Sequence, residues 1–266
     1  MKTLWFVFLG LGLFVSAHAG VPLQAAVENS ARTPAFVTRD VWRHPYETLS
    51  FFGIEPNSTV VELSPGGGWY TEILAPFVHD QGQLILGLDD PMSTNPESMH
   101  FRELLDVKFK AHPQIYDKVV MGVFAPFDKL DYAQPVSVDV VLTFRNIHNW
   151  MSAGDSGVRQ VFASVFRSLK SGGVFGVVEH RLPEDRVQDP KSSSGYVHTS
   201  YVIELAKSVG FKLEASSEIN ANPKDHADHP GGVWALPPSF VNKEVNKSQY
   251  QAIGESDRMT LKFVKP

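Results

Sequence analysis

The chain of 266 residues contains no cysteine. This absence excludes disulfide bonds, thiolate metal ligands, cysteine nucleophiles and a lipoprotein attachment site. A chain of this length can be stable without disulfides, because it is long enough to bury a sizeable hydrophobic core.

A surplus of basic residues is also missing. Lysine and arginine number 24 against 29 aspartates and glutamates, which gives a formal net charge of −5. Nucleic-acid-binding domains usually show clustered positive charge. We therefore expect no nucleic-acid partner.

Long apolar runs are missing everywhere except at the N-terminus. There, residues 4–15 are apolar, follow Lys2 and precede Ala17-His18-Ala19, a pattern of small residues typical of a cleavage site. The run is short for a membrane span, so we interpret residues 1–19 as a signal peptide cut after Ala19. An uncleaved N-terminal anchor is the alternative. The sequence thus predicts a periplasmic or secreted protein without a stable membrane anchor after cleavage.

The most informative stretch begins with a short apolar run that contains Val60 and Val61 and ends at Glu62. Three glycines, residues 66–68, follow, and the apolar residues after them have helical spacing. This pattern predicts a buried strand, a tight turn and a helix. Glycines let the backbone approach a ligand closely, and such a turn is where open α/β sheets bind nucleotide-like ligands.

This stretch resembles motif I of the class I S-adenosylmethionine-dependent methyltransferases, in the variant found in a group of exported bacterial predicted methyltransferases. The motif usually reads acid-x-Gly-x-Gly-x-Gly, whereas here Ser64 stands at the first glycine. The resemblance implies S-adenosylmethionine as the cofactor, a small-molecule acceptor, and binding of the cofactor by the motif itself. Its residues at the expected contacts are Glu62, Ser64, Gly66, Gly67 and Gly68.

Four residues outside the motif complete the expected cofactor site. Asp89 ends the next apolar run, 21 residues after Gly68, where an acid is placed to accept hydrogen bonds from ribose hydroxyls. The resemblance further implies that Arg43 meets the cofactor carboxylate, that Phe127 lies near the adenine and that Arg145 contacts the cofactor. A surface arginine and a core phenylalanine are the plain alternatives.

Polar residues at the ends of two later strands are the catalytic candidates. Asn146 and His148 follow the run Val138–Phe144, and His180 follows residues 174–178. Because the interior of a fold rejects unpaired polar groups, polar groups at strand ends beside a cofactor turn are candidates for orienting or deprotonating an acceptor. A loop-stabilising role for His148 stays open.

Seven apolar runs interleaved with helical patterns predict an α/β fold. The resemblance implies a Rossmann-like, mostly parallel seven-stranded sheet with helices on both faces. Its last strand, residues 259–265, is expected to be antiparallel and near the edge. We assign residues 20–38 to an N-terminal leader and residues 39–266 to the methyltransferase-like domain.

Histidine and aspartate are close together at Asp225, His226, Asp228 and His229. The four lie in a loop rich in proline and glycine, without the helical spacing that presents ligands to zinc in metalloproteases. We therefore expect no metal.

Two functions remain in contention. The first is an S-adenosylmethionine-dependent methyltransferase. The second is an exported, non-catalytic module of the same fold that binds another ligand, because this cofactor is not expected outside the cytoplasm. A hydrolase with Ser64 as nucleophile is disfavoured, since Pro65 follows it and no Gly-x-Ser-x-Gly elbow is present.

The signal-peptide interpretation predicts a mature N-terminus at Gly20. N-terminal sequencing of the protein from the periplasmic or secreted fraction should begin there. A full-length chain confined to the cytosol would contradict the prediction.

Overall fold

The computed structural model describes residues 20–266, so the expected signal peptide lies outside the described residues. Within these residues, no helix combines the length and the apolar character that crossing a membrane requires. Residues 20–38 form two short helices, α1 (Leu23–Val27) and α2 (Pro34–Val37), and Ala26 of α1 is fully buried. The leader expected from the sequence is therefore packed onto the domain.

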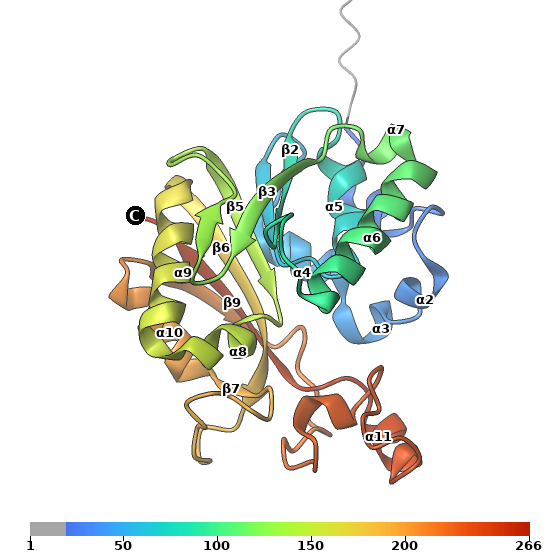
Figure 1. Ribbon diagram of the computed structural model, residues 1–266, viewed down its shortest axis with the longest axis vertical. Coiled ribbons are helices and arrows are strands. Elements are labelled where there is room, and N and C mark those ends of the chain that lie inside the picture. Colours follow the sequence, from blue (N-terminus) through green and yellow to red (C-terminus); the bar gives the residue numbers. More distant parts are fainter. Residues whose placement is uncertain (1–19) are drawn as a thin grey trace, which may run out of the picture.

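One mixed sheet organises the molecule (Figure 1). Its central strand, β1 (Thr59–Leu63), pairs in parallel with β2 (Gln83–Leu88) on one side and β5 (Val138–Phe144) on the other. Because all three strands run in the same direction, Leu63, Leu88 and Phe144 end at one edge of the sheet. The segments that follow these strands are brought together there.

The sheet of the described residues has nine strands, two more than the seven expected. The order is β4-β3-β2-β1-β5-β6-β9-β8, with β7 paired to β6 outside this path. The additional strands are β4 and β7, short pieces whose few residues carry no visible alternation in the sequence. The bounds are β3 Val120–Ala125, β4 Lys129–Asp131, β6 Leu169–Leu182, β7 Val197–His198, β8 Lys212–Ser217 and β9 Arg258–Val264.

The last strand, β9, is antiparallel to β6, as expected. It lies between β6 and β8, so β8 forms the edge of the sheet. Strand β6 also starts earlier than expected, at Leu169, because Gly172 adopts a positive φ of 78° inside the extended segment and the chain continues in β pairing beyond it.

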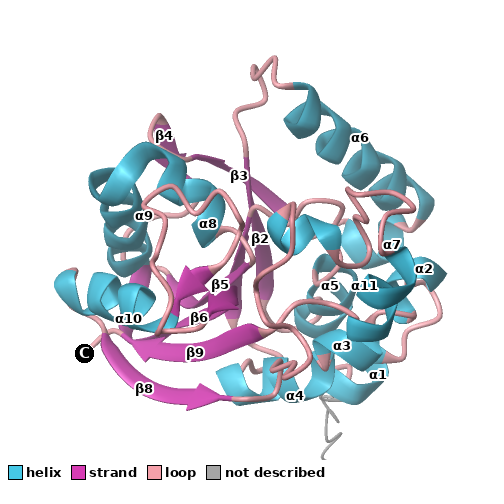
Figure 2. Cartoon of the chain, turned by 90° about the horizontal axis from the view of Figure 1, so that it is seen from below, coloured by secondary structure: helices cyan, strands magenta, loops and turns pink. Residues whose placement is uncertain are grey.

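Helices cover both faces of the sheet, as the resemblance implies (Figures 1 and 2). Successive residues of β1 alternate between two cores: Val60 packs with the layer of α4 and α5, and Val61 with the layer of α9 and α10. A strand buried on both faces reads as a continuous apolar run, which is why β1 and β5 are visible in the sequence. The first layer contains α4 Pro45–Phe52, α5 Thr71–Val78, α6 Pro96–Ala111 and α7 Pro113–Tyr116; the second contains α8 Ile147–Trp150, α9 Gly154–Ser168 and α10 Thr199–Ser208.

The N-terminal helices contact a segment that lies shortly before the last strand of the chain. Helix α3 (Asp40–Arg43) lies beside the segment that leads from α11 (Lys247–Ile253) into β9 (Figure 1). The two are joined by a hydrogen bond of 2.6 Å from Arg39 Nε to a carboxylate oxygen of Glu255. Single 3₁₀ turns, Met151–Ala153 and Gly232–Ala235, complete the secondary structure.

Candidate active site

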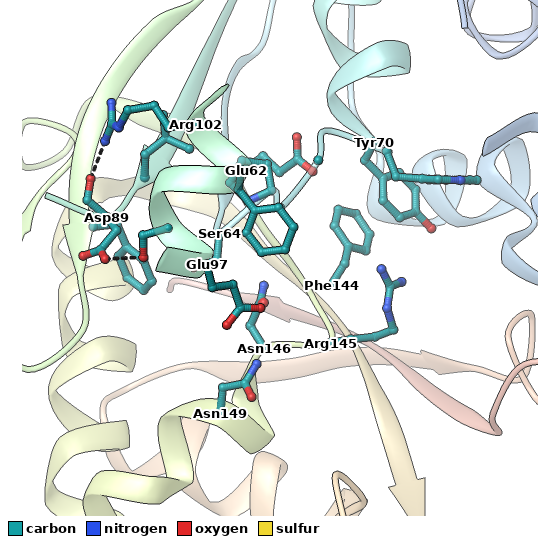
Figure 3. A pocket seen from close by; sticks show the side chains of 18 of the residues that line it. Glu62, Ser64, Tyr70, Asp89, Glu97, Arg102, Phe144, Arg145, Asn146 and Asn149 are labelled. Atoms are coloured by element: carbon teal, nitrogen blue, oxygen red, sulfur yellow. Dashed lines mark hydrogen bonds between the residues drawn. The ribbon is translucent and has the colours of Figure 1, made fainter. Parts of the chain in front are cut away.

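A cavity of about 980 Å³ opens at the edge where β1, β2 and β5 end. Such a volume is at the upper end of the range of about 300–1,000 Å³ that is usual for small-molecule sites. Most of the expected site residues line it (Figure 3). They are Arg43, Glu62, Ser64, Gly66, Gly67, Asp89, Phe127, Arg145 and Asn146.

The turn after β1 presents its backbone to this cavity. Ser64 adopts a positive φ of 49°, and its N–H donates to Gly87 O at 2.9 Å, so the turn keeps its left-handed backbone although serine replaces glycine. A Cβ at Gly67 would have only ordinary contacts, the nearest at 3.6 Å from Leu104. Gly67 therefore lines the cavity without being required by the packing of the protein.

Gly68 has a different position from Gly66 and Gly67, because it does not line the cavity. Its φ is 82°, and a Cβ there would come within 2.9 Å of Leu105. The packing of α6 against the turn thus requires glycine at this position, independently of any ligand.

Glu62 is the buried acid at the end of β1. Burial raises the pKa of its carboxyl to about 7, and the Thr71 hydroxyl, which donates to it at 2.6 Å, and the nearby Arg145 offset this only in part. At neutral pH this carboxyl is therefore present in both protonation states.

Asp89 directly follows β2 and also lines the cavity. One carboxylate oxygen accepts from the Asp90 N–H at 2.8 Å and the other from the Ser98 hydroxyl at 2.5 Å. Burial acts to raise the pKa of Asp89, but these hydrogen bonds and the nearby Arg102 outweigh burial and lower it. Asp89 is thus a carboxylate, able to accept hydrogen bonds from a ligand.

The walls between these polar groups are aromatic and apolar. Phe124 at the end of β3 and Phe127 after it line the cavity, together with Leu88 and Trp150. Near the end of β5, the ring of Phe144 stacks on Tyr70 with the centroids 3.6 Å apart.

Arginines gather at one end of the cavity. Arg39 and Arg43 each donate from Nε to Glu255, at 2.6 and 3.1 Å, and both line the cavity. Arg43 also lies over the ring of Trp69, 4.8 Å from its centroid. Arg145 lines the same end with a backbone φ of 62°.

The catalytic histidines expected from the sequence do not line the cavity. His148 is a buried residue of α8, with Nδ1 3.0 Å from a carboxylate oxygen of Glu179. Glu179 is fully buried and also accepts from the backbone N–H groups of Ile147 and His180. The sequence assigned no role to Glu179, although its position at the end of a strand was a usable signal.

His180 packs beside His148, with the ring centroids 5.3 Å apart, and hydrogen-bonds through Nδ1 to the Ser256 hydroxyl. Burial, then the nearby His148 and Arg145, lower its pKa well below the usual value, so His180 is neutral. His148, Glu179 and His180 offer ligand atoms within 4.8 Å of one another, the arrangement in the described residues best suited to a metal ion. The Glu179 carboxylate already accepts hydrogen bonds from backbone N–H groups. This favours Glu179 as the hydrogen-bond partner of His148 over a role as a metal ligand.

The loop that contains Asp225 is built around hydrogen bonds of this carboxylate. Asp225 accepts from the Tyr196 hydroxyl at 2.9 Å and from the Asp257 N–H at 2.8 Å, and His229 Nε2 lies 2.8 Å from it. These contacts assign Asp225 and His229 to the architecture of the loop.

Other cavity residues had no interpretable pattern in the sequence. Glu97, Ser98 and Arg102 come from α6, Asn149 from α8, and Pro238 from the loop after the second 3₁₀ turn. Only the tertiary fold brings these segments to the cavity.

The raised pKa of Glu62 predicts how stability depends on pH. Its carboxyl has a pKa of about 7 in the folded protein against an ordinary value of 4.5, so the folded state binds the proton more tightly. The free energy of unfolding therefore falls as pH rises from about 4.5 through 7, by up to about 3 kcal/mol. Glu62→Gln should remove this loss, so the variant should melt above wild type at pH 8 and close to it at pH 5.

Glu72 provides the matched control, because it is also buried but is paired with Lys108 and accepts from the Thr33 hydroxyl at 2.6 Å. Glu72→Gln should lower the melting temperature at pH 8. If Glu62→Gln also lowers it, the carboxyl of Glu62 is stabilising as a charged group and the interpretation is wrong.

No protein-family profile and no curated protein sequence matches the chain. Solved structures do match its fold. A SAM-dependent methyltransferase from Aquifex aeolicus is 13% identical with a TM-score of 0.51, covering 75% of this chain and 94% of the other. A putative sarcosine dimethylglycine methyltransferase from Galdieria sulphuraria is 13% identical with a TM-score of 0.54, covering 90% and 89%. The [4+2]-cyclase SpnF is 13% identical with a TM-score of 0.59 and covers 92% of each chain.

At these identities the likeness establishes the fold and leaves the chemistry to the site itself. The strand order, the antiparallel β9 and the helices on both faces agree with it. The chain has the fold of the class I S-adenosylmethionine-dependent methyltransferases.

Proposed function

We propose that this protein is an S-adenosylmethionine-dependent methyltransferase that acts on a small-molecule acceptor. The observation that carries the proposal is the cavity at the ends of β1 and β2, where the open turn at Gly67 and the carboxylate of Asp89 line the same space. In open α/β sheets, this arrangement binds a ligand that has a ribose.

Different residues around the cavity are expected to bind different parts of the cofactor. Gly66 and Gly67 allow close approach of the backbone, Asp89 accepts hydrogen bonds from the ribose hydroxyls, and the apolar residues Phe124 and Phe127 lie against the adenine. Arg43 faces the carboxylate. When bound, the cofactor supplies an electrophilic methyl group for transfer to the acceptor. Positioning of two reactants in one cavity can supply about 7–11 kcal/mol of the barrier reduction.

The acceptor side is formed by the segment after β5. Asn146 uses Nδ2 to donate to Leu63 O at 3.0 Å and to the Thr143 hydroxyl at 3.1 Å, which leaves its Oδ1 to accept a hydrogen bond from the acceptor. Outside the cavity lining, Glu179 orients His148 through Nδ1, so that Nε2 is the nitrogen left to accept a proton. A neutral imidazole is a competent base for a hydroxyl or amine.

The alternative is a non-catalytic module that binds another ligand after export. Two observations support this alternative: the expected signal peptide, and the similarity in fold to SpnF, which is described as a cyclase. Calorimetric titration of S-adenosylhomocysteine into residues 20–266 separates the two proposals, since the module requires no affinity for it.

Asp89 gives a specific test of cofactor binding. Hydrogen bonds to a charged group contribute about 1.5–3 kcal/mol, so Asp89→Ala should weaken S-adenosylhomocysteine binding by roughly one to two orders of magnitude. The carboxylate is partly exposed, so the melting temperature should change little. Calorimetry at constant pH measures the affinity.

Asp90 is the control, because its carboxylate accepts from the Met92 N–H and lies outside the cavity lining. Asp90→Ala should leave the affinity within about threefold, well under the energy of one such hydrogen bond. Equal affinities for wild type and both variants would show that Asp89 does not bind the ribose.

The glycine turn gives a second test, with two glycines that differ in their surroundings. Gly67→Ala adds a methyl group to the cavity wall at ordinary distances from Leu104 and Phe36, so we expect a normal melting temperature and a loss of S-adenosylhomocysteine affinity. Gly68→Val meets Leu105 at a positive φ, so we expect a lower melting temperature. Retention of full affinity in Gly67→Ala would place the cofactor elsewhere.

A further inference from the structure

We propose that the methyl acceptor is an anion with two negative charges, a phosphate or a pair of carboxylates, bound at the arginine end of the cavity. We define the arginine end as Arg39, Arg43 and Arg145, which line the cavity, with Arg258 behind them. This inference rests on the proposed function above, because it identifies the second ligand of the same cavity.

The arginine end carries more positive charge than its protein partners balance. Glu255 is the carboxylate that holds it together, with Nε of Arg39 at 2.6 Å, Nε of Arg43 at 3.1 Å and Nη1 of Arg258 at 3.2 Å. Glu62 is also near Arg145, but its raised pKa of about 7 leaves it largely neutral below that pH. There, four guanidinium groups, always protonated in proteins, face one charged carboxylate, an excess of three positive charges. The neighbouring Arg32 does not change this count, because it pairs with Asp40 at 2.7 Å.

Arg145 is the least satisfied member of the arginine end. Its Nη1 is buried without a hydrogen-bond partner, and its side chain forms no ion pair with any residue in the range 20–266. Burial, followed by repulsion from Arg258, lowers its pKa, and burial followed by repulsion from Arg145 lowers that of Arg43. A buried charge without a partner is destabilising, so a protein that keeps one is expected to bind a counter-charge there.

The cofactor does not supply enough negative charge. It has one carboxylate, which the sequence assigns to Arg43, and its ammonium and sulfonium groups are both cationic. Two positive charges of the arginine end therefore remain for the acceptor. Guanidinium groups bind phosphates and carboxylates through paired, charge-assisted hydrogen bonds, which fits a doubly charged oxyanion better than a neutral acceptor.

The position of Arg145 connects this anion to the reaction. Arg145 precedes Asn146 in the chain, and both side chains extend from the end of β5 into the cavity (Figure 3). An acceptor anchored by its anionic group at Arg145 therefore lies beside the amide that is expected to orient it.

The test is calorimetry and thermal melting of residues 20–266 with phosphate, malonate, acetate or chloride at equal ionic strength. Each anion is measured without cofactor and with saturating S-adenosylhomocysteine. We expect phosphate or malonate to bind and to raise the melting temperature in both conditions, while acetate and chloride have no specific effect. Equal effects of all four anions would overturn the inference.

Two arginine variants, each of which loses one positive charge, locate the binding. Arg145→Gln should weaken phosphate binding by about tenfold to a hundredfold, as expected for the loss of charge-assisted hydrogen bonds. Without an anion it should melt above wild type, because it removes an unpaired buried charge. Arg102→Gln is the control: Arg102 lines the other end of the cavity and donates to Asp89 O, so phosphate affinity should be retained. An Arg145→Gln variant that melts lower and binds phosphate normally would show a purely structural arginine.

The same data separate this inference from the proposed function. Binding of S-adenosylhomocysteine without binding of phosphate or malonate would overturn the inference alone. Binding of phosphate without S-adenosylhomocysteine would overturn the proposed methyltransferase and, with it, the assignment of the anion as acceptor. Competition between phosphate and S-adenosylhomocysteine would assign the arginine end to the cofactor carboxylate and overturn the inference.

Discussion

The arginine end of the cavity depends on the ion pairs of the Glu255 carboxylate. This carboxylate binds Arg39 and Arg43 from the N-terminal part of the chain and Arg258 from β9. Burial acts to raise its pKa, but the charges of Arg43, Arg258 and Arg39 outweigh burial and lower it to about 2. Glu255 therefore stays charged at any physiological pH. Without that charge, the arginines that surround it would repel one another, and the N-terminal helices would lose one of their links to β9.

The direction of the central strands is the second constraint. Because β1, β2 and β5 are parallel, three segments far apart in sequence share one edge: the turn after Glu62, Asp89 and the segment from Arg145. Each of these segments follows a strand that is buried on both faces, and such strands are visible as apolar runs. This is why the fold, the glycine turn and part of the cavity lining were predictable from the sequence.

The remaining parts of the site were not predictable, for reasons that differ from residue to residue. Gly68 belongs to the same motif as Gly67, and only the position of Leu105 on α6 shows that packing requires it. His148 lies in α8, where Glu179 holds its ring, and His180 lies inside β6, which continues to Leu182 beyond the apolar run visible in the sequence; neither side chain lines the cavity. Arg39 and Glu255 are separated by more than two hundred residues, and no local pattern links two such positions.

The distribution of charge in the cavity relates these observations to the proposed reaction. The carboxylate of Asp89 lies toward one side and the arginine end lies at the other, with aromatic walls between them (Figure 3). A ligand with hydroxyl groups at one terminus and a carboxylate at the other is favoured in a single direction, because the reverse places its carboxylate against Asp89. That direction brings the carboxylate of the proposed cofactor toward Arg43 and leaves Arg145 and Asn146 for the acceptor. The fold is shared with a cyclase and does not by itself determine the chemistry. We therefore expect the charges at the arginine end of the cavity to determine which acceptor this protein binds.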